Sequence, residues 1–194
     1  MYYSYSTLMS KFESIKKEIE RIIEEGNPSD NAHSKTTCKW LLRIKPDADE
    51  AMQIAALAHD IDRAIPERRL KEELWEQNYA TYKEFKDDHA ANSAQIIGEV
   101  LEKFDFDKEA IDRVKYLVAN HERGGDEDAN AIRDADSLAF FEQTISRFVE
   151  IYGLEKLEAK VRFMYDRMSD KAKELVKQMK FKEEFQKIID KVIR

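Results

Sequence analysis

Histidine is the most informative residue type in this sequence, because the chain contains only four: His33, His59, His89 and His121. Each lies on or beside a run of apolar residues at helical spacing, so we expect all four to face the interior. A single histidine on an apolar face is usually a core residue with a hydrogen-bond partner. Four such histidines favour another interpretation, because imidazole is the commonest metal ligand near neutral pH and helical bundles build metal sites from converging side chains. The pattern therefore predicts a metal centre.

Carboxylates accompany these histidines. Asp60 directly follows His59 at the predicted end of an alanine-rich apolar helix, where both side chains can reach one ion. Asp134 and Asp136 lie together in the segment RDADSL. Helical periodicity places Asp134 on an apolar stripe and turns Asp136 away from it, so the residues alone leave the choice between them open. Mixed imidazole and carboxylate ligands favour Mn, Fe, Co, Ni or Zn over calcium.

The set His33, His59-Asp60 and Asp136 resembles the HD superfamily of metal-dependent phosphohydrolases. The segment LAHDIDR (57–63) resembles the second motif of that superfamily, and DADSL (134–138) resembles its last motif. His89 and His121 are similar to the extra ligands of HD proteins that hold two metals, including the HD-GYP cyclic-dinucleotide phosphodiesterases, but the tripeptide GYP is absent. The segment KPDADEAMQIAALAHDI and a later Met-Ser (168–169) also resemble a bacterial family of HD-like proteins without known activity.

The resemblance implies a reaction and a set of site residues. The reaction is hydrolysis of a phosphoester by metal-activated hydroxide, with one or two divalent metals per chain (Mn, Fe, Co, Ni, Zn or Mg). The implied metal ligands are His33, His59, Asp60, His89, His121 and Asp136. Asp60 would bridge two metals and, with Arg63, act in catalysis. Asp134 would then lie beside the ligands rather than among them.

Other charged residues near these motifs are candidates for binding the substrate phosphate or supporting the ligands. They are Lys35, Glu67, Glu122, Arg123, Arg133, Asp134 and Arg162, with Lys160 and Arg167 near Arg162. For each of them the alternative interpretation is an exposed charge on a helix surface. Trp75, Tyr79 and Tyr82 are aromatic residues that can stack on a base, but such residues are more often packing anchors, so they do not define a base site.

The elements that must position these residues are helical, because strand-like alternation of apolar and polar residues is absent. We expect a turn at 27–30, a capping box formed by Asp47 and Glu50, and a loop at 124–130. The expected helices cover 6–25, 31–44, 51–64, part of 67–78, 81–104, 108–122, 130–152, 154–178 and 181–193. The fold class is therefore all-α: a single HD-like bundle of about eight helices over residues 1–194. Its motif core covers about 30–150, and the N-terminal and C-terminal helices pack on that core.

Composition limits the partners. Lys and Arg number 33 and Asp and Glu number 40, and the net charge of −7 argues against stable nucleic-acid binding. The single cysteine, Cys38, excludes an internal disulfide framework, and we expect a cytoplasmic protein. No apolar run approaches the roughly 18 residues of a membrane span. The stripe of Phe181, Phe185 and Ile189 is expected either to pack within the domain or to form a homodimer contact.

Three functions remain open at this point. The first is a metal-dependent phosphohydrolase acting on a small phosphorylated metabolite, with a nucleotide as the first choice. The second is an HD module that binds metal and ligand without turnover. The third is a two-metal phosphodiesterase acting on a cyclic or linear nucleotide. The simplest alternative to all three is a helical protein whose histidines only fill the core.

Overall fold

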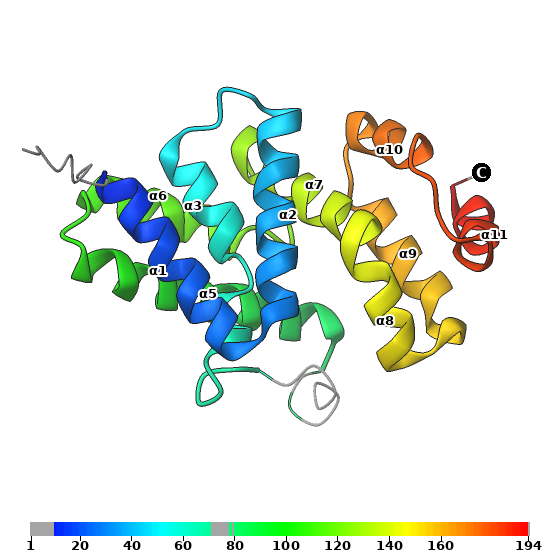
Figure 1. Cartoon of the computed structure of the whole chain (residues 1–194), viewed down its shortest axis with the longest axis horizontal. Coiled ribbons are helices and arrows are strands. Elements are labelled where there is room, and N and C mark those ends of the chain that lie inside the picture. The colour runs from blue at the N-terminus through cyan, green and yellow to red at the C-terminus, as the bar shows by residue number, and fades with distance from the viewer. Residues whose placement is uncertain (1–9, 71–77, 79, 194) are drawn as a thin grey trace, which may run out of the picture.

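The computed structural model describes residues 10–70, 78 and 80–193, and within these ranges every regular element is helical (Figure 1). The expected all-α class is therefore confirmed. One cluster of buried hydrophobic side chains extends from Ile15 in the first helix to Ile189 in the last. No helix in the described part of the chain combines the length and the apolar character needed to cross a membrane.

Helices α1 (Lys11–Gly26) and α2 (Pro28–Ile44) form a hairpin joined by Asn27 alone (Figure 1). The side chain of Asn27 accepts a hydrogen bond from the backbone N–H of Ser29 at 3.1 Å and so caps α2. The expected turn at 27–30 is thus wrong. Proline is well tolerated in the first turn of a helix, so α2 begins at Pro28 instead of after it.

Helix α3 (Glu50–Ala58) is the buried centre of the fold, and α1, α2, α6 and α7 all contact it. Its small alanine side chains permit this close packing. The side chain of Asp49 accepts from the N–H of Met52 at 2.8 Å and caps the helix. The expected cap at Asp47 is wrong because α3 begins directly after Asp49, whose carboxylate is the one that reaches the free N–H groups of the first turn.

After α3 the chain passes through His59 and Asp60 into the 3₁₀ helix η1 (Ile61–Ala64). The last residue of α1, Gly26, lies against the backbone of Ala64 so closely that a Cβ at position 26 would overlap it. A glycine is therefore required where α1 meets η1, and this contact fixes the segment that follows Asp60.

Helices α5 (Tyr82–Lys103) and α6 (Lys108–Ala119) pack against each other behind α3. Thr81 and Glu84 form a capping box at the start of α5, and the side chain of Asp107 caps α6. The predicted helix at 108–122 ends earlier, at Ala119, so His121 follows α6 in a turn instead of lying within the helix.

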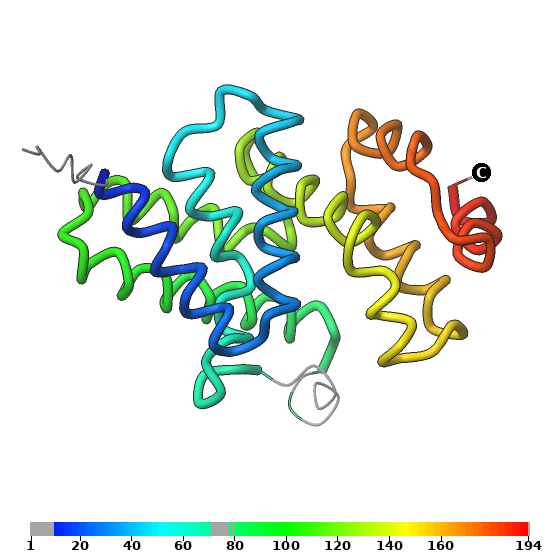
Figure 2. Tube along the Cα trace, viewed as in Figure 1, coloured from blue at the N-terminus to red at the C-terminus, as the bar shows by residue number. Residues whose placement is uncertain are grey.

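Three consecutive elements form one continuous helical rod that links the two halves of the molecule (Figure 2). They are α7 (Glu127–Ala139), the π-helix η3 (Phe140–Thr144) and α8 (Ile145–Tyr152). The rod begins before the expected residue 130 because Asp126 caps it, and it ends at Gly153, whose φ is +85°. Single π-turns inside helices are frequent at functional sites.

The chain then continues through η4 (Leu154–Lys156), α9 (Leu157–Asp166), α10 (Asp170–Lys177) and α11 (Glu183–Val192). With α8, these helices form the half of the molecule on the right of Figure 1. The single helix expected over 154–178 is divided, because Ser169 caps a new helix. In α11 the side chains of Phe185 and Ile189 are buried, and the ring of Phe181 lies 6.2 Å from that of Phe141. The C-terminal stripe thus packs inside the chain.

Candidate metal centre

Six buried side chains from five segments converge where α2, α3, α5, α6 and α7 meet. They are His33 on α2, His59 and Asp60 after α3, His89 on α5, His121 after α6, and Asp136 on α7. His59 and His121 have no exposed surface, and the other four are at most 8 % exposed. The structure therefore brings all the ligands implied by the resemblance into one cluster.

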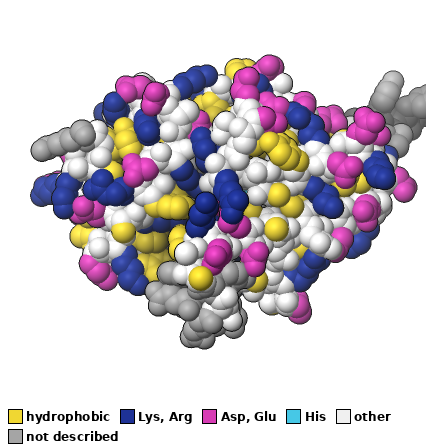
Figure 3. All heavy atoms as spheres, turned by 180° about the vertical axis from the view of Figure 1, so that it is seen from behind, with side chains coloured by type: hydrophobic (Ala, Val, Ile, Leu, Met, Phe, Trp, Pro, Cys, Tyr) yellow, Lys and Arg dark blue, Asp and Glu magenta, His cyan; other side chains and the backbone are white. Residues whose placement is uncertain are grey.

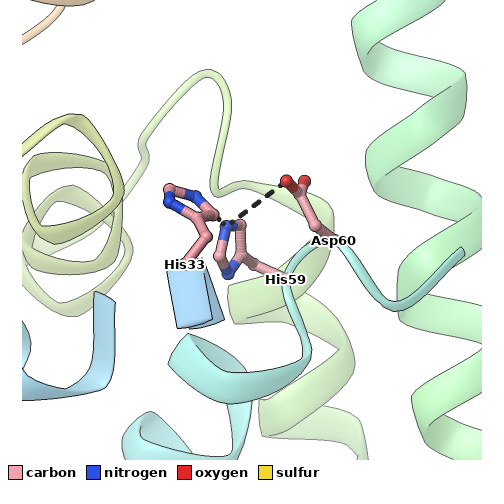
Figure 4. A group of neighbouring side chains, drawn as sticks. All are labelled: His33, His59 and Asp60. Atoms are coloured by element: carbon pink, nitrogen blue, oxygen red, sulfur yellow. Dashed lines mark hydrogen bonds and ion pairs between the residues drawn. The ribbon is translucent and has the colours of Figure 1, made fainter. Parts of the chain in front are cut away.

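The first half of the cluster is formed by His33, His59 and Asp60, whose side chains point toward one another in Figure 4. The two Nε2 atoms of His33 and His59 are 3.3 Å apart, and the Nε2 atom of His59 is 3.6 Å from Oδ2 of Asp60. The carboxylate of Asp136 joins them, with its Oδ1 atom 3.0 Å from Nε2 of His33 and 3.6 Å from Nε2 of His59. These atoms can ligate one metal ion.

The second half of the cluster is formed by Asp60, His89 and His121. The Oδ1 atom of Asp60 lies 2.8 Å from Nε2 of His89 and 3.6 Å from Nε2 of His121. Asp60 therefore belongs to both halves and offers a different oxygen to each: Oδ2 toward His59 and Oδ1 toward His89 and His121. A carboxylate placed in this way can bridge two ions.

Backbone carbonyls orient two of the imidazoles. The Nδ1 atom of His59 lies 2.9 Å from the carbonyl oxygen of Ala56, and Nδ1 of His121 lies 2.7 Å from that of Val118. A carbonyl can only accept, so in both rings Nδ1 carries the proton that is donated. In the neutral ring Nε2 then has a free lone pair, and in both residues this atom faces the carboxylates.

Side chains orient the other two imidazoles in the same way. The hydroxyl of Thr144 donates to Oε1 of Gln143 at 2.8 Å, so it accepts from Nδ1–H of His33 at 3.0 Å. Nδ1 of His89 donates to Oδ1 of Asp62 at 2.9 Å. All four histidines thus have a partner for Nδ1–H and direct Nε2 inward, which is the usual arrangement of metal-bound histidines.

The carboxylates of the cluster are ionised. Burial by itself would raise the pKa of Asp60, but Arg63 and His59 outweigh it and hold that pKa well below its usual value. Burial acts in the same direction on Asp136, and Arg167 together with His33 and His59 holds its pKa low. Two carboxylates therefore carry negative charge inside the protein, where charge of one sign is costly without a counter-charge.

The imidazoles respond to this negative charge differently. Burial opposes protonation of His59, but Asp60 and Asp136 outweigh it and raise the pKa of His59 to about 9. Burial dominates at His121 and lowers its pKa, which favours the neutral ring that ligates metal. The part of the cluster around His59 therefore attracts a positive charge, which a metal ion can supply in place of a proton.

The donor set fits a divalent cation. The Nε2 atom of His121 is buried and has no hydrogen-bond partner among the described residues. It faces Oδ1 of Asp60 at 3.6 Å and Oε1 of Glu122 at 3.4 Å, and both of these oxygens are acceptors. Oε1 of Glu122 also pairs with the ammonium of Lys86, so the atom left without a donor is Nε2 of His121, and a cation would satisfy it. Imidazole nitrogen with carboxylate oxygen suits a transition metal.

The two aspartates of the DADSL segment have separate roles. Asp136 contacts His33 and His59, as described above, and its other oxygen forms an ion pair with Arg167. Asp134 points toward α10, where it accepts from the backbone N–H of Ser169 at 2.9 Å and from the Ser169 hydroxyl. Asp134 thus supports the start of α10 and does not contact the histidines.

Two basic residues, the buried Lys86 and the largely buried Arg167, pair with Glu122 beside the histidines. Oε1 of Glu122 pairs with the ammonium of Lys86, and Oε2 lies 2.6 Å from Nη1 of Arg167. The same guanidinium also contacts Asp136, so Arg167 connects carboxylates next to both halves of the cluster. Burial would raise the pKa of Glu122, but Lys86 and Arg167 hold it well below its usual value.

A cleft of about 240 Å³ opens above the cluster. His33, Asp60, Glu122 and Asp136 contribute to its floor, and its other lining residues include basic and aromatic side chains: Arg63, Arg69, Lys86, Arg147, Lys160, Arg167, Phe140, Phe148 and Tyr152. The guanidinium of Arg63 lies 3.2 Å from Oδ2 of Asp60. Near the centre of the face shown in Figure 3, basic and hydrophobic side chains also lie side by side.

Five of the charged candidates from the sequence lie away from this cleft. They are Lys35, which pairs with Glu20; Arg162, which pairs with Glu158; Arg123, which pairs with Asp87; Arg133, which donates to the carbonyl of Arg123; and the exposed Glu67. Among the aromatic candidates, Tyr82 stacks on Phe85 outside the cleft, and Trp75 and Tyr79 lie outside the described residues.

Three residues of the site were not predicted from the sequence: Asp62 and Thr144 contact histidines of the cluster, and Lys86 pairs with Glu122 beside it. Asp62 follows Asp60 by two positions, and Lys86 precedes His89 by one helical turn, so the neighbourhood of each motif carried a weak signal. Thr144 lies on a separate element from its partner His33 and is brought there by the π-turn. No local pattern marks such a contact.

Comparison with known proteins identifies the family of this chain. No curated protein and no solved structure shows a significant match to the chain. Residues 10–189 match the family described as a domain of unknown function, DUF4202. The match covers all six residues of the cluster and nearly all of the described helices. The chain therefore belongs to the DUF4202 family.

Proposed function

We propose that this chain is an HD-type, metal-dependent phosphohydrolase that cleaves a phosphoester of a small phosphorylated metabolite, with nucleotides as the first class to test. One observation carries the proposal. All four imidazoles donate Nδ1–H to an acceptor and direct Nε2 toward Asp60 and Asp136. A set of histidines that only fills a core has no reason to share this orientation.

The resemblance to the HD superfamily supports the proposal because its motif residues meet in space. Asp60 in LAHDIDR and Asp136 in DADSL approach the same imidazole, that of His59, at 3.6 Å. A divalent transition metal in such a site supplies a water of lowered pKa and screens phosphoryl oxygens. Because Asp60 offers one oxygen to each half of the cluster, the residues suit two ions per chain.

The cleft above the cluster supports an anionic substrate. Arg63 contacts Asp60 and lines the cleft, so in this proposal it binds a phosphoryl oxygen beside the ligands. Lys86 and Arg167 neutralise the negative charge of Glu122, so the carboxylate of Glu122 does not repel an anion in the cleft. A phosphate group entering the cleft therefore meets positive charge.

The test is phosphate release by the purified chain without a histidine tag, loaded separately with Mn, Fe, Co, Ni and Zn. Nucleotides, other phosphomonoesters and phosphodiesters are each supplied, and the bound metal is measured in the same samples. We expect metal-dependent hydrolysis that falls more than about 100-fold in Asp60→Ala. The matched control is Asp87→Asn, which removes a surface carboxylate paired with Arg123 and should leave the rate unchanged.

Two results would count against the proposal. Metal-loaded protein that releases phosphate from none of the three substrate classes would reject the phosphohydrolase and favour a binding module without turnover. Full activity of Asp60→Ala would show that the histidine cluster is not the active centre. Hydrolysis of phosphodiesters in preference to monoesters would support the third function above, a two-metal phosphodiesterase.

A further inference from the structure

One face of the helical rod leads away from the metal cluster along the cleft. Its cleft-lining residues are Thr144, Arg147, Phe148, Ile151 and Tyr152, which recur at helical spacing, and we call them the α8 face. Thr144 begins the face and hydrogen-bonds His33. With a rise of 1.5 Å per residue, Tyr152 lies about 12 Å further along the axis than Thr144. A phosphate group held at the cluster would cover only the start of the α8 face, and most of the face would remain open to the rest of the substrate.

The α8 face presents aromatic and apolar surface. The rings of Phe148 and Tyr152 have centroids 4.9 Å apart, and Phe140 lies 6.1 Å from Phe148. Ile151, which lies between Phe148 and Tyr152 in the sequence, is 56 % exposed and adds apolar surface to this face. Aromatic side chains can stack on any nucleobase, because every base has a π-face.

Positive charge accompanies these rings. The ammonium of Lys160, on α9, lies 5.6 Å from the ring of Phe140 and 6.0 Å from that of Phe148. Arg147 is exposed on the α8 face and forms no ion pair with any residue in the described ranges. The carboxylates that line the cleft are on other elements: Asp30, Asp60, Glu122 and Asp136. This end of the cleft therefore favours an anionic group.

We propose that the α8 face binds the part of the substrate to which the reacting phosphate is attached. A planar aromatic base stacks on Phe148 and Tyr152, and Arg147 binds a second anionic group of the same molecule. The substrate class is then a nucleotide with a charged group besides the reacting phosphate, in preference to sugar or polyol phosphates. This inference rests on the proposed function, since the cluster must hold the reacting phosphate.

Binding of non-hydrolysable analogues tests the stacking part independently of turnover. The metal-loaded full chain is titrated by calorimetry with two phosphonates, one derived from adenosine and one from ribose without a base. We expect the adenosine compound to bind about tenfold more tightly. Phe148→Leu and Tyr152→Leu should each reduce this preference and leave binding of the ribose compound unchanged. Tyr116→Leu is the matched control, because Tyr116 is an exposed ring on α6 that does not line the cleft.

The role of Arg147 is tested with a third phosphonate that carries an additional 3′-phosphate on the adenosine. We expect this phosphate to tighten binding several-fold, in the range of one charge-assisted hydrogen bond. Arg147→Gln should abolish that gain and leave the binding of the simpler adenosine compound unchanged. Arg162→Gln is the matched control, since Arg162 is an exposed arginine paired with Glu158 outside the cleft.

The results separate this inference from the proposed function. Equal binding of the adenosine and ribose compounds, or binding of neither, would overturn the α8 face as a base subsite. Hydrolysis of ribose phosphate as efficient as that of nucleotides would overturn it too, although the phosphohydrolase would stand. Binding that depends on Tyr152 and Arg147 in a protein that hydrolyses no phosphoester would support the subsite and reject the activity.

Discussion

At the scale of single residues, the pair Asp134 and Asp136 shows what helical periodicity can and cannot predict. Two positions on a helix are about 200° apart, so the pair must face different directions. Periodicity places Asp134 on an apolar stripe and Asp136 on the opposite side, and in the structure α7 is buried on both sides, with both aspartates at most 6 % exposed. The resemblance to the HD superfamily selects Asp136, and the tertiary structure places Asp136 beside the histidines and Asp134 beside Ser169.

This separation predicts opposite effects of substitution at the two positions. Asp136→Asn should reduce the metal content, because it removes the charge beside His33 and His59. Asp134→Ala should keep the metal content and lower the free energy of unfolding by about 1–3 kcal/mol, because the N–H of Ser169 loses its acceptor. Elemental analysis and urea denaturation of both variants measure the two effects. Loss of metal in Asp134→Ala with retention in Asp136→Asn would reverse the assignment.

The partners of the Nδ1 atoms could not be predicted from the sequence. Those of His59 and His121 are backbone carbonyls, which any residue provides, so no residue type marks them. The partner of His33 is Thr144, which is distant in the chain and depends on a π-turn. The six residues that meet in the cluster could be predicted, because histidine is rare in this chain and the spacing of the set resembles a known family.

At the scale of elements, the histidine cluster is built where helices end. Asp60 follows α3 and His121 follows α6, so neither is held by a complete helical turn. The sequence predicted most helices correctly, because their apolar spacing is strong. Their ends were less predictable: several residues able to cap lie close together near α3, and the start of α10 depends on contact between Ser169 and Asp134.

The contact between α1 and η1 predicts that a methyl group at Gly26 damages the metal centre from a distance. Gly26→Ala should lower the free energy of unfolding by about 1–3 kcal/mol and reduce metal affinity, because the Cβ overlaps the backbone of Ala64 next to the Asp60 segment. Urea denaturation and metal titration measure both quantities.

Gly98→Ala is the matched control for this substitution. The added Cβ would lie 2.9 Å from Cδ of Lys115, a flexible side chain that can move away. We expect unchanged metal affinity and a stability gain of at most about 1 kcal/mol from the helical preference of alanine. If both glycine variants behave alike, the approach of α1 to η1 does not position Asp60.

At the scale of the whole molecule, the C-terminal helices are part of the site. Arg167, at the end of α9, contacts Glu122 and Asp136, and α8 and α9 supply one wall of the cleft. The motif core predicted at about 30–150 therefore lacks a buried counter-charge and one cleft wall. The sequence predicted Arg167 only as one of several charged candidates, because arginine is a common surface residue and nothing in its local pattern distinguishes it from the others.

If the buried cluster holds a metal ion, as proposed, metal binding is coupled to folding. A ligand at 100 times its dissociation constant stabilises the native state by about 2.7 kcal/mol. Removal of metal by a chelator should therefore lower the melting temperature of the wild-type chain and leave that of Asp60→Ala nearly unchanged. Thermal unfolding monitored by circular dichroism measures the shift. Equal shifts in both proteins would place the stabilising ion elsewhere.

The proposed two-metal site is tested by the metal content of the gently purified chain, made without a histidine tag or chelator. Asp60→Ala serves as the test variant and Asp87→Asn as the control. We expect about two transition-metal ions per chain in the wild type and the control, with both ions lost in Asp60→Ala, because Asp60 belongs to both halves of the cluster. Absence of metal from the wild type, even after reconstitution with Mn, Fe, Co and Zn, would contradict it.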